Sequence, residues 1–357
     1  MMSAHPDKQP SSLSAVPEEK SARGGGAPDA QRPEREALFE RLELRPPPPG
    51  LPPRRTLRRG DLRGGARVDG VQVSDSASIR LRRLWQQLTT TQGQRDEAAL
   101  EERLTQRRHV TRTNLVAVVS PKGGVGKTTS SFLIGDLLAS RPKLRVLVVD
   151  TNPDFGTLGK LAPDSHRSDH QLTDVINQMD RIRSAAELDP FMATTPTGLH
   201  LLAAPQRPEL MEAMSPKMYG ELLSFLGRFY HVIVLDLGTG LTDPLAQFAL
   251  GRADQAVVVS QPTWVTLSTV LEALDYVLKR LGGHQLTMAL NQAPRGAAIK
   301  ALESKLRSHQ IARQVTIPED KRLREMLDDG TYVCEQLPRR TRLAIKQLAL
   351  AVADQLV

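Results

Sequence analysis

A glycine-rich loop at residues 120–129, Ser-Pro-Lys-Gly-Gly-Val-Gly-Lys-Thr-Thr, constrains the fold of this chain more than any other feature. A run of aliphatic residues, 115–119, leads directly into the loop, and a helical pattern over 128–140 follows it. A glycine turn between a strand and a helix lets backbone N–H groups and the positive end of the helix dipole surround an anion. The order of strand, loop and helix therefore predicts a phosphate-binding cradle.

Each residue type in the loop has a role in such a cradle. The glycines let the backbone approach phosphate closely, Lys127 is expected to contact the β- and γ-phosphates, and the Thr128 hydroxyl is expected to ligate Mg²⁺. A second lysine, Lys122, precedes the glycines, and a second cation would offset charge that develops on a transferred phosphoryl group. The residues expected to bind the nucleotide here are Gly123, Gly124, Val125, Gly126, Lys127, Thr128 and Thr129.

From residue 114 onward, short aliphatic runs alternate with longer helical patterns. The predicted strands are 115–119, 146–149, 199–203, 232–235, 256–259 and 286–290, and the predicted helices include 128–140, 216–229 and 265–281. Uninterrupted aliphatic strands of this length are typical of a parallel sheet that is buried on both faces. The expected fold class is α/β, a doubly wound, mostly parallel sheet of the P-loop NTPase type, in one domain over 114–357.

Two of the predicted strands end in an aspartate. Strand 146–149 is followed by Asp150, and strand 232–235 is followed by Asp236 and then by Gly238-Thr239-Gly240. An aspartate that closes a buried strand beside a phosphate loop is placed to hold Mg²⁺. Thr128, Asp150 and Asp236 are therefore the expected Mg²⁺ site.

The run Lys122-Gly-Gly-Val-Gly-Lys-Thr-Thr129 resembles the deviant Walker A signature of the MinD/ParA family of ATPases, and the resemblance covers 114–357. The generic phosphate loop begins with glycine where this chain has Pro121. In that family ATP lies between two copies in a head-to-head dimer. The resemblance thus implies a homodimer in the ATP-bound state, in which Lys122 reaches the partner's nucleotide and Lys127 its own. The implied activity is Mg²⁺-dependent hydrolysis of ATP to ADP and phosphate.

The resemblance also assigns roles to three further residues. Asn152 stands where the family's switch I has a carboxylate that positions the attacking water. An amide orients a water molecule but does not accept its proton, so slow hydrolysis is expected. Asn291 matches the asparagine that contacts adenine, and Pro318 lies in a segment that matches the loop over the base. The alternative for each of these two is an ordinary role as a capping or turn residue. The expected catalytic residues are Lys122, Lys127, Asn152 and Asp236.

Residues 1–75 read as a disordered arm. They contain Gly24–Gly26 and a proline-rich run at 46–53, and apolar residues are sparse. Residues 45–67 carry seven arginines against one acidic residue, Asp61. Such a segment attracts DNA, RNA or an anionic membrane, and its alternative is a solvated tail.

Residues 76–113 are predicted to form a basic, amphipathic helical linker. Its apolar residues fall on one helical face and are Leu81, Leu84, Trp85 and Leu88. This face is expected to dock on the chain's own globular domain, with a partner helix or a membrane surface as the alternatives. A second amphipathic segment, 341–357, is expected to pack in the core rather than to bind a membrane.

Composition narrows the setting in which this chain acts. The net charge is +8, of which residues 1–113 contribute +6 from 21 basic and 15 acidic side chains. A single cysteine, Cys334, excludes a disulfide framework and fits a reducing compartment, where it is expected to serve packing. The eight histidines do not form a metal-binding set. No apolar run approaches the ~20 residues that span a bilayer. The expected location is the cytoplasm, with recruitment to the membrane or the nucleoid left open.

The sequence is compatible with three functions. The first is a dimerising Mg²⁺-ATP-dependent ATPase that acts as a slow switch in spatial organisation or in the regulation of secretion machinery. An arginine-rich arm, a tryptophan-bearing helix and a MinD-like domain together resemble the MinD-like ATPases of actinobacterial type VII secretion loci, which implies a protein partner. The second is a ParA-like partitioning ATPase that binds nonspecific DNA, against which the +2 charge of residues 114–357 argues mildly. The third is a nucleotide-gated binding module in which hydrolysis is incidental.

Overall fold

The computed structural model describes residues 95–106, 110–141, 144–152, 156–294 and 313–357, together with Glu303, Leu306 and Ile311. The predicted disordered arm, residues 1–75, and the apolar face from Leu81 to Leu88 lie outside the described residues. The description begins with a helix at residues 95–105, which precedes the first strand.

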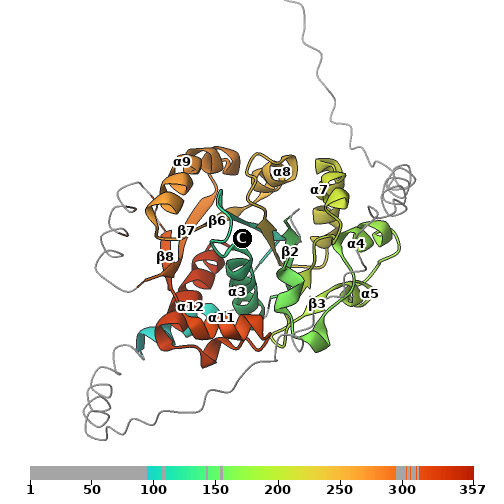
Figure 1. The fold of residues 1–357 in the computed structure, drawn as a ribbon. Coiled ribbons are helices and arrows are strands. Elements are labelled where there is room, and N and C mark those ends of the chain that lie inside the picture. Colours follow the sequence, from blue (N-terminus) through green and yellow to red (C-terminus); the bar gives the residue numbers. More distant parts are fainter. Residues whose placement is uncertain are drawn as a thin grey trace, which may run out of the picture.

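An eight-stranded sheet forms the centre of the fold (Figure 1). Its strands lie in the order β3-β4-β2-β5-β1-β6-β7-β8. The pair β3–β4 is antiparallel, and every other pair of neighbours is parallel. The strand bounds are β1 Asn114–Val119, β2 Val146–Thr151, β3 Ala193–Thr194, β4 His200–Leu202, β5 Val232–Leu237, β6 Gln255–Ser260, β7 Gln285–Ala293 and β8 Arg313–Pro318. The predicted doubly wound, mostly parallel α/β class is confirmed.

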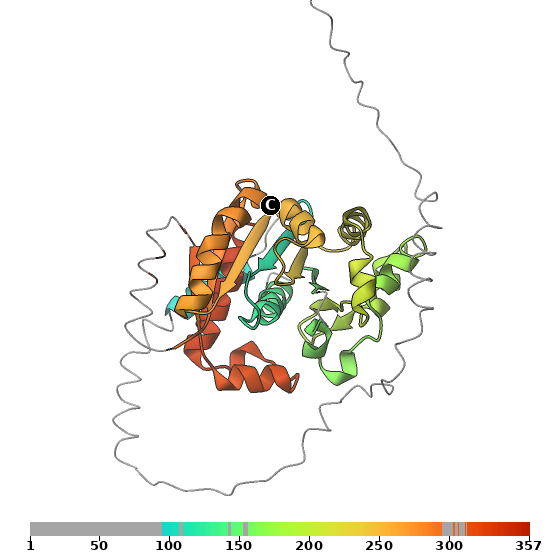
Figure 2. The same ribbon diagram turned by 45° about the horizontal axis from the view of Figure 1, so that its top comes forward.

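Helices cover both faces of the sheet (Figures 1 and 2). One layer contains α3 (Lys127–Ser140), α11 (Lys321–Asp328) and α12 (Arg339–Ala353). The other contains α4 (Leu172–Gln178), α7 (Pro216–Leu226), α8 (Pro244–Arg252) and α9 (Trp264–Leu281). Shorter helical segments are η3 (Leu158–Leu161), η4 (Asp164–His166), α5 (Ala185–Leu188), η5 (Asp189–Phe191), α6 (Pro208–Glu212) and η6 (Cys334–Gln336). None of the described helices combines the length and the apolarity needed to cross a membrane.

Side chains of the central strands alternate between two hydrophobic clusters. Val116 and Val118 of β1 pack with α3 and α12, whereas Ala117 and Val119 pack with the helices of the opposite layer. Successive residues of a strand point to opposite faces, so a strand covered on both sides needs apolar residues at every position. This is why uninterrupted aliphatic runs predicted the central strands.

The sequence analysis did not predict the two outermost strands, β3 and β8. β8 begins with Arg313 and Gln314, which are only partly buried, so its apolar residues alternate with polar ones. β3 has two residues and pairs with one neighbour. Edge strands have one unpaired side and need no continuous aliphatic run. Helix α7 also ends at Leu226, three residues before the predicted end.

Helix α12 is a core element, as expected for residues 341–357. Leu348 and Val352 are fully buried against α3 and the sheet. Lys346 of the same helix is also buried, with 3% of its surface exposed. The single cysteine, Cys334, is buried beside this helix.

An ionic cluster surrounds the buried ammonium group of Lys346. Lys346 Nζ lies 2.8 Å from Glu101 Oε2, 3.2 Å from Glu335 Oε1 and 3.6 Å from Glu97 Oε1. Arg342 Nε contacts Glu97 at 2.6 Å, and this hydrogen bond is the largest of the effects that hold the pKa of Glu97 below its usual range. Two of the three carboxylates in the cluster therefore come from the helix at residues 95–105.

The same helix is also held by apolar contact and by α3. Leu104 is fully buried in the cluster that contains α3 and α12, and Leu100 packs beside it. Arg141, which caps the carboxyl end of α3, forms ion pairs with both Glu101 and Glu335. The helix at 95–105 is thus joined to the helix whose other end begins at the glycine loop.

Candidate nucleotide-binding site

The glycine loop joins β1 to α3 at the carboxyl edge of the sheet. Gly124 and Gly126 adopt positive φ angles of 73° and 95°, a region that side chains other than glycine rarely enter. Gly126 is the N-cap of α3, and no side chain caps the helix there. The first turn also contains no acidic residue. The first N–H groups of α3 are therefore available to an anion.

The two lysines of the loop lie in different surroundings. Lys127 is 9% exposed, and burial lowers its pKa, while the nearby Asp236 carboxylate acts in the opposite direction. Lys122 is exposed, and its backbone N–H donates to Ser120 Oγ at 3.2 Å. A buried lysine is placed to contact a phosphate bound by its own chain. An exposed lysine on a flexible stem can contact a group on another molecule.

Two buried carboxylates lie side by side next to the loop. Asp150 of β2 and Asp236 of β5 are partners in the parallel register, and each is 1% exposed. Burial raises the pKa of Asp150 to about 6. Burial and the neighbouring Asp150 raise the pKa of Asp236 to about 7. Placing two carboxylates together in the interior favours a bound cation that neutralises them.

The residues at this position fit Mg²⁺. Asp236 Oδ2 is buried without a hydrogen-bond partner, so one hard oxygen ligand is available. Asp150 is held in place by backbone N–H groups of Asn152 and Leu158, each 3.1 Å from one of its oxygens. Space beside it depends on Gly156, because a Cβ there would lie 2.1 Å from Asp150 Oδ2. Thr128 lies close enough to hydrogen-bond to Asp236.

The loop after Asp236 lies against the glycine loop. A Cβ built on Gly123 would meet Thr239 Cγ2 at 3.7 Å. Thr239 and Gly240 are exposed, and the chain turns immediately afterwards into α8, where the Asp243 side chain accepts hydrogen bonds from Leu245 and Ala246. Asn152 follows β2 at the same edge of the sheet. Pro153, Asp154 and Phe155 lie outside the described residues.

Asn291 braces the glycine loop from β7. Its Nδ2 donates to the carbonyl oxygen of Val125 at 2.8 Å, and the side chain is buried. Pro318 lies on the neighbouring strand β8, where it pairs with Ala293. The two residues expected to contact adenine therefore come from adjacent strands at the edge that carries the loop. The hydrogen bond to Val125 is a structural role that the sequence did not indicate.

Comparisons with known proteins agree with this geometry. The profile of the AAA domain family matches residues 113–285. The ESX-1 secretion-associated protein EspI of Mycobacterium tuberculosis is 25% identical over 248 residues, which cover 67% of this chain and 36% of EspI. The chain thus matches about a third of the length of that relative.

Two MinD proteins are also similar. The septum site-determining protein MinD of Bacillus subtilis is 29% identical over 147 residues, 41% of this chain and 53% of MinD. The structure of MinD complexed with Mg-ADP from Pyrococcus horikoshii matches with a TM-score of 0.52 at 23% identity, over 66% of this chain and 94% of that one. The chain is thus similar to MinD in sequence and to ParA and MinD proteins in fold.

Sequence reasoning missed three polar residues that support the candidate nucleotide site. Ser131 Oγ donates to Asp236 Oδ1 at 3.4 Å from one turn along α3. Gln261 Nε2 donates to the carbonyl oxygen of Gly124 at 3.4 Å and to Gln292 Oε1 at 2.6 Å. Gln292 has a positive φ of 55°, uncommon for a residue other than glycine. Only Ser131 had a sequence signal, its spacing of four residues from Lys127.

Proposed function

We propose that this protein is a Mg²⁺-dependent ATPase of the MinD/ParA type that works as a slow switch between an ATP-bound dimer and a monomer. One observation carries the proposal: the unpartnered Asp236 Oδ2 beside Asp150, at the edge where α3 begins without a side-chain cap. A phosphate on the loop and a cation on the carboxylates would satisfy both groups together.

The chain's own residues divide the work of phosphoryl transfer. The loop amides and Lys127 hold the phosphates, and Lys122 is exposed so that it can reach the nucleotide of a second copy. Mg²⁺, when bound through Thr128, Asp150 and Asp236, supplies positive charge against the β- and γ-phosphates. Asn291 Nδ2 is already used on Val125, so its Oδ1 is the atom suited to accept a hydrogen bond from the adenine amino group.

The test is phosphate release by the full chain with ATP, with and without Mg²⁺, accompanied by its mass in solution with ATP and with ADP. We expect slow, Mg²⁺-dependent release of phosphate. The mass should double with ATP but not with ADP.

Lys127→Ala should lower phosphate release at least about 100-fold, because it removes the buried cation from the phosphates. Release that is independent of Mg²⁺, or unchanged in Lys127→Ala, would refute the assignment.

Asn152→Asp should raise the turnover several-fold. An aspartate at the end of β2 could accept a proton from the attacking water, whereas the native amide only orients it. Single-turnover hydrolysis of ATP compares the two proteins, with Lys127→Ala as the background rate. An unchanged or lower rate would mean that residue 152 does not position the water.

We propose a role at a protein partner, in the regulation of secretion machinery. The support is the similarity to EspI, an ESX-1 secretion-associated protein, of which the match covers 36%. A salt series of DNA binding with ATP and with ADP tests the alternative of chromosome or plasmid partitioning. ATP-dependent binding that weakens steeply with salt would favour partitioning and overturn the proposed role.

A further inference from the structure

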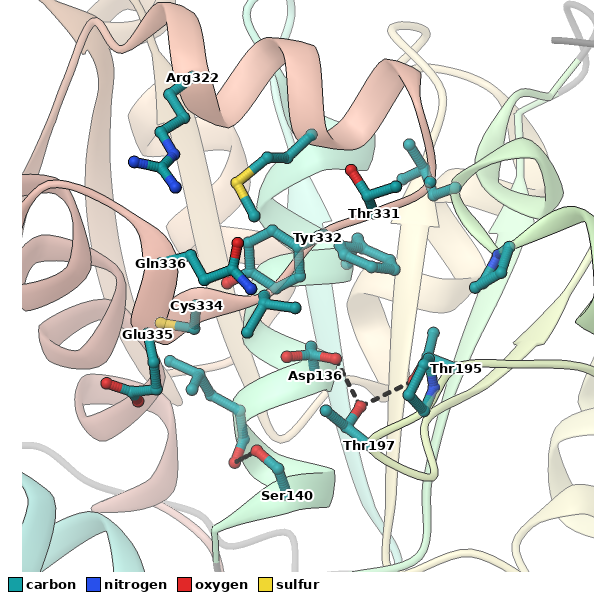
Figure 3. A pocket seen from close by; sticks show the side chains of 18 of the residues that line it. Asp136, Ser140, Thr195, Thr197, Arg322, Thr331, Tyr332, Cys334, Glu335 and Gln336 are labelled. Atoms are coloured by element: carbon teal, nitrogen blue, oxygen red, sulfur yellow. Dashed lines mark hydrogen bonds between the residues drawn. The ribbon is translucent and has the colours of Figure 1, made fainter. Parts of the chain in front are cut away.

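A cavity of about 580 Å³ opens between the carboxyl-terminal half of α3, helix α11, the turn at 195–197 and the segment 330–336 (Figure 3). None of its lining residues belongs to the glycine loop or to the switch segments. Its volume lies within the range of about 300–1,000 Å³ that small-molecule sites occupy. The proposed ATPase function makes no use of it.

A buried carboxylate projects among the lining side chains. Asp136 is 3% exposed, on a helix whose residues from Ser130 to Ala139 are all buried. Figure 3 shows Asp136 at the centre of the labelled side chains, joined by a hydrogen bond to the Thr197 hydroxyl, which in turn bonds to Thr195. Among the described residues, no lysine, arginine or histidine forms a salt bridge with it. Burial raises the pKa of Asp136 to about 6.

Apolar and aromatic side chains form one part of the wall around this carboxylate. Phe132 and Tyr332 contact edge to face with ring centroids 5.4 Å apart, and Met326 of α11 lines the same space. The Cys334 thiol and the Tyr332 hydroxyl stay neutral near pH 7, because burial raises the pKa of each, that of Cys334 to about 11.

Three charged side chains also line the cavity. Arg141 and Glu335 form an ion pair with each other, and Arg322 is exposed on α11. Arg141 is also paired with Glu101. The charge of Arg141 acts to lower the pKa of Asp136, but the ion pairs of Arg141 are with Glu101 and Glu335.

We propose that this cavity binds a small organic cation, with an amidinium, guanidinium or ammonium group on Asp136 and an apolar body against Phe132 and Met326. A carboxylate in an apolar site is costly unless it is paired, and one hydroxyl partner leaves it with spare capacity to accept hydrogen bonds. A planar cation can donate two parallel hydrogen bonds to a carboxylate. Its aromatic body would fill space that would otherwise hold water.

Benzamidine is the probe, because it joins an amidinium to a phenyl ring. Isothermal titration of the full chain should show saturable binding of benzamidine and at least tenfold weaker binding of neutral benzamide. Asp136→Asn, which keeps the shape of the side chain, should weaken benzamidine at least tenfold. Asp328→Asn is the matched control, because Asp328 is exposed on α11 and does not line the cavity. It should leave binding unchanged.

Two further measurements do not depend on the folding of the Asp136 variant. With a pKa of about 6, Asp136 is about one-tenth ionised at pH 5 and almost fully ionised at pH 8, so benzamidine should bind about tenfold more weakly at pH 5. Val333→Trp, at a lining position that is 43% exposed, should block the cavity without disturbing the core. The proposal would be overturned by a native chain that shows no saturable binding or no dependence on pH. It would also be overturned by undiminished binding in Asp136→Asn or in Val333→Trp.

Discussion

Replacing Gly126 with alanine is expected to weaken nucleotide binding strongly. At its φ of 95° a side chain is strained, which costs about 1–3 kcal/mol. The new Cβ would also lie 2.1 Å from Asn291 Nδ2, the atom that holds the Val125 carbonyl oxygen. Either the loop or the Asn291 side chain must therefore move, and in both cases the hydrogen bond to Val125 is disturbed. We expect affinity for a fluorescent ATP analogue to fall about 100-fold, equivalent to about 2.8 kcal/mol.

Two variants separate the causes of that loss. Gly251→Ala in α8 is the control, because its Cβ would make only an ordinary contact of 3.9 Å, and it should bind the analogue normally. Adding Asn291→Ala to Gly126→Ala removes the clash but leaves the strained φ, so it should recover part of the affinity. Native affinity in Gly126→Ala would show that the loop does not need the geometry described here.

The double variant Glu97→Gln/Glu101→Gln should be less stable by about 2 kcal/mol and should release the helix at 95–105. In this variant the buried ammonium of Lys346 keeps a single ion pair from this cluster, with Glu335, whose side chain is half exposed. Breaking a buried ion pair from one side costs more than removing the whole pair, because a charge stays buried without compensation. The loss of stability cannot exceed the free energy needed to detach the helix at 95–105, because water reaches Lys346 once the helix has left.

Detachment has a direct readout in trypsin cleavage after Arg103. The next residue, Leu104, is fully buried, so cleavage requires the helix to leave its site. Cleavage should accelerate in the double variant, and the midpoint of urea unfolding should fall. Adding Lys346→Met should restore most of the midpoint, since the buried charge is then gone. Arg103→Gln, which removes an exposed ion pair with Asp354, should shift unfolding by less than about 1 kcal/mol. A double variant as stable as the native chain would contradict this account.

Local sequence patterns predicted the parts of the site that are built from consecutive residues. The glycine loop follows one strand, and Asp150 and Asp236 each close another, so parallel order alone brings them to one edge. Nothing local indicated that Asn291 bonds to the Val125 carbonyl, because the two are 166 residues apart.

The burial of charged residues was also hidden from the sequence. In the sequence, Lys346 looks like a surface residue of an amphipathic helix. Its ion pair with Glu101, which lies 245 positions earlier, is seen only in the folded chain. Asp136 interrupts a buried helix, and its partner Thr197 lies 61 positions away. The pairing of such groups depends on contacts between distant segments, which a single sequence does not reveal.

The attachment point of the helix at 95–105 has a consequence for valency. Helix α3 has 14 residues, so Arg141 lies about 20 Å from the phosphate cradle at its other end. Where ATP joins two copies across their nucleotide faces, as proposed, the preceding segments of both copies would leave from opposite outer ends of the pair. Such a pair would be bivalent for any target that the two segments bind. When one segment holds a repetitive target, the local concentration of the other rises, so that weak individual contacts add up to firm retention. Hydrolysis would then end the retention by halving the valency, without weakening either contact.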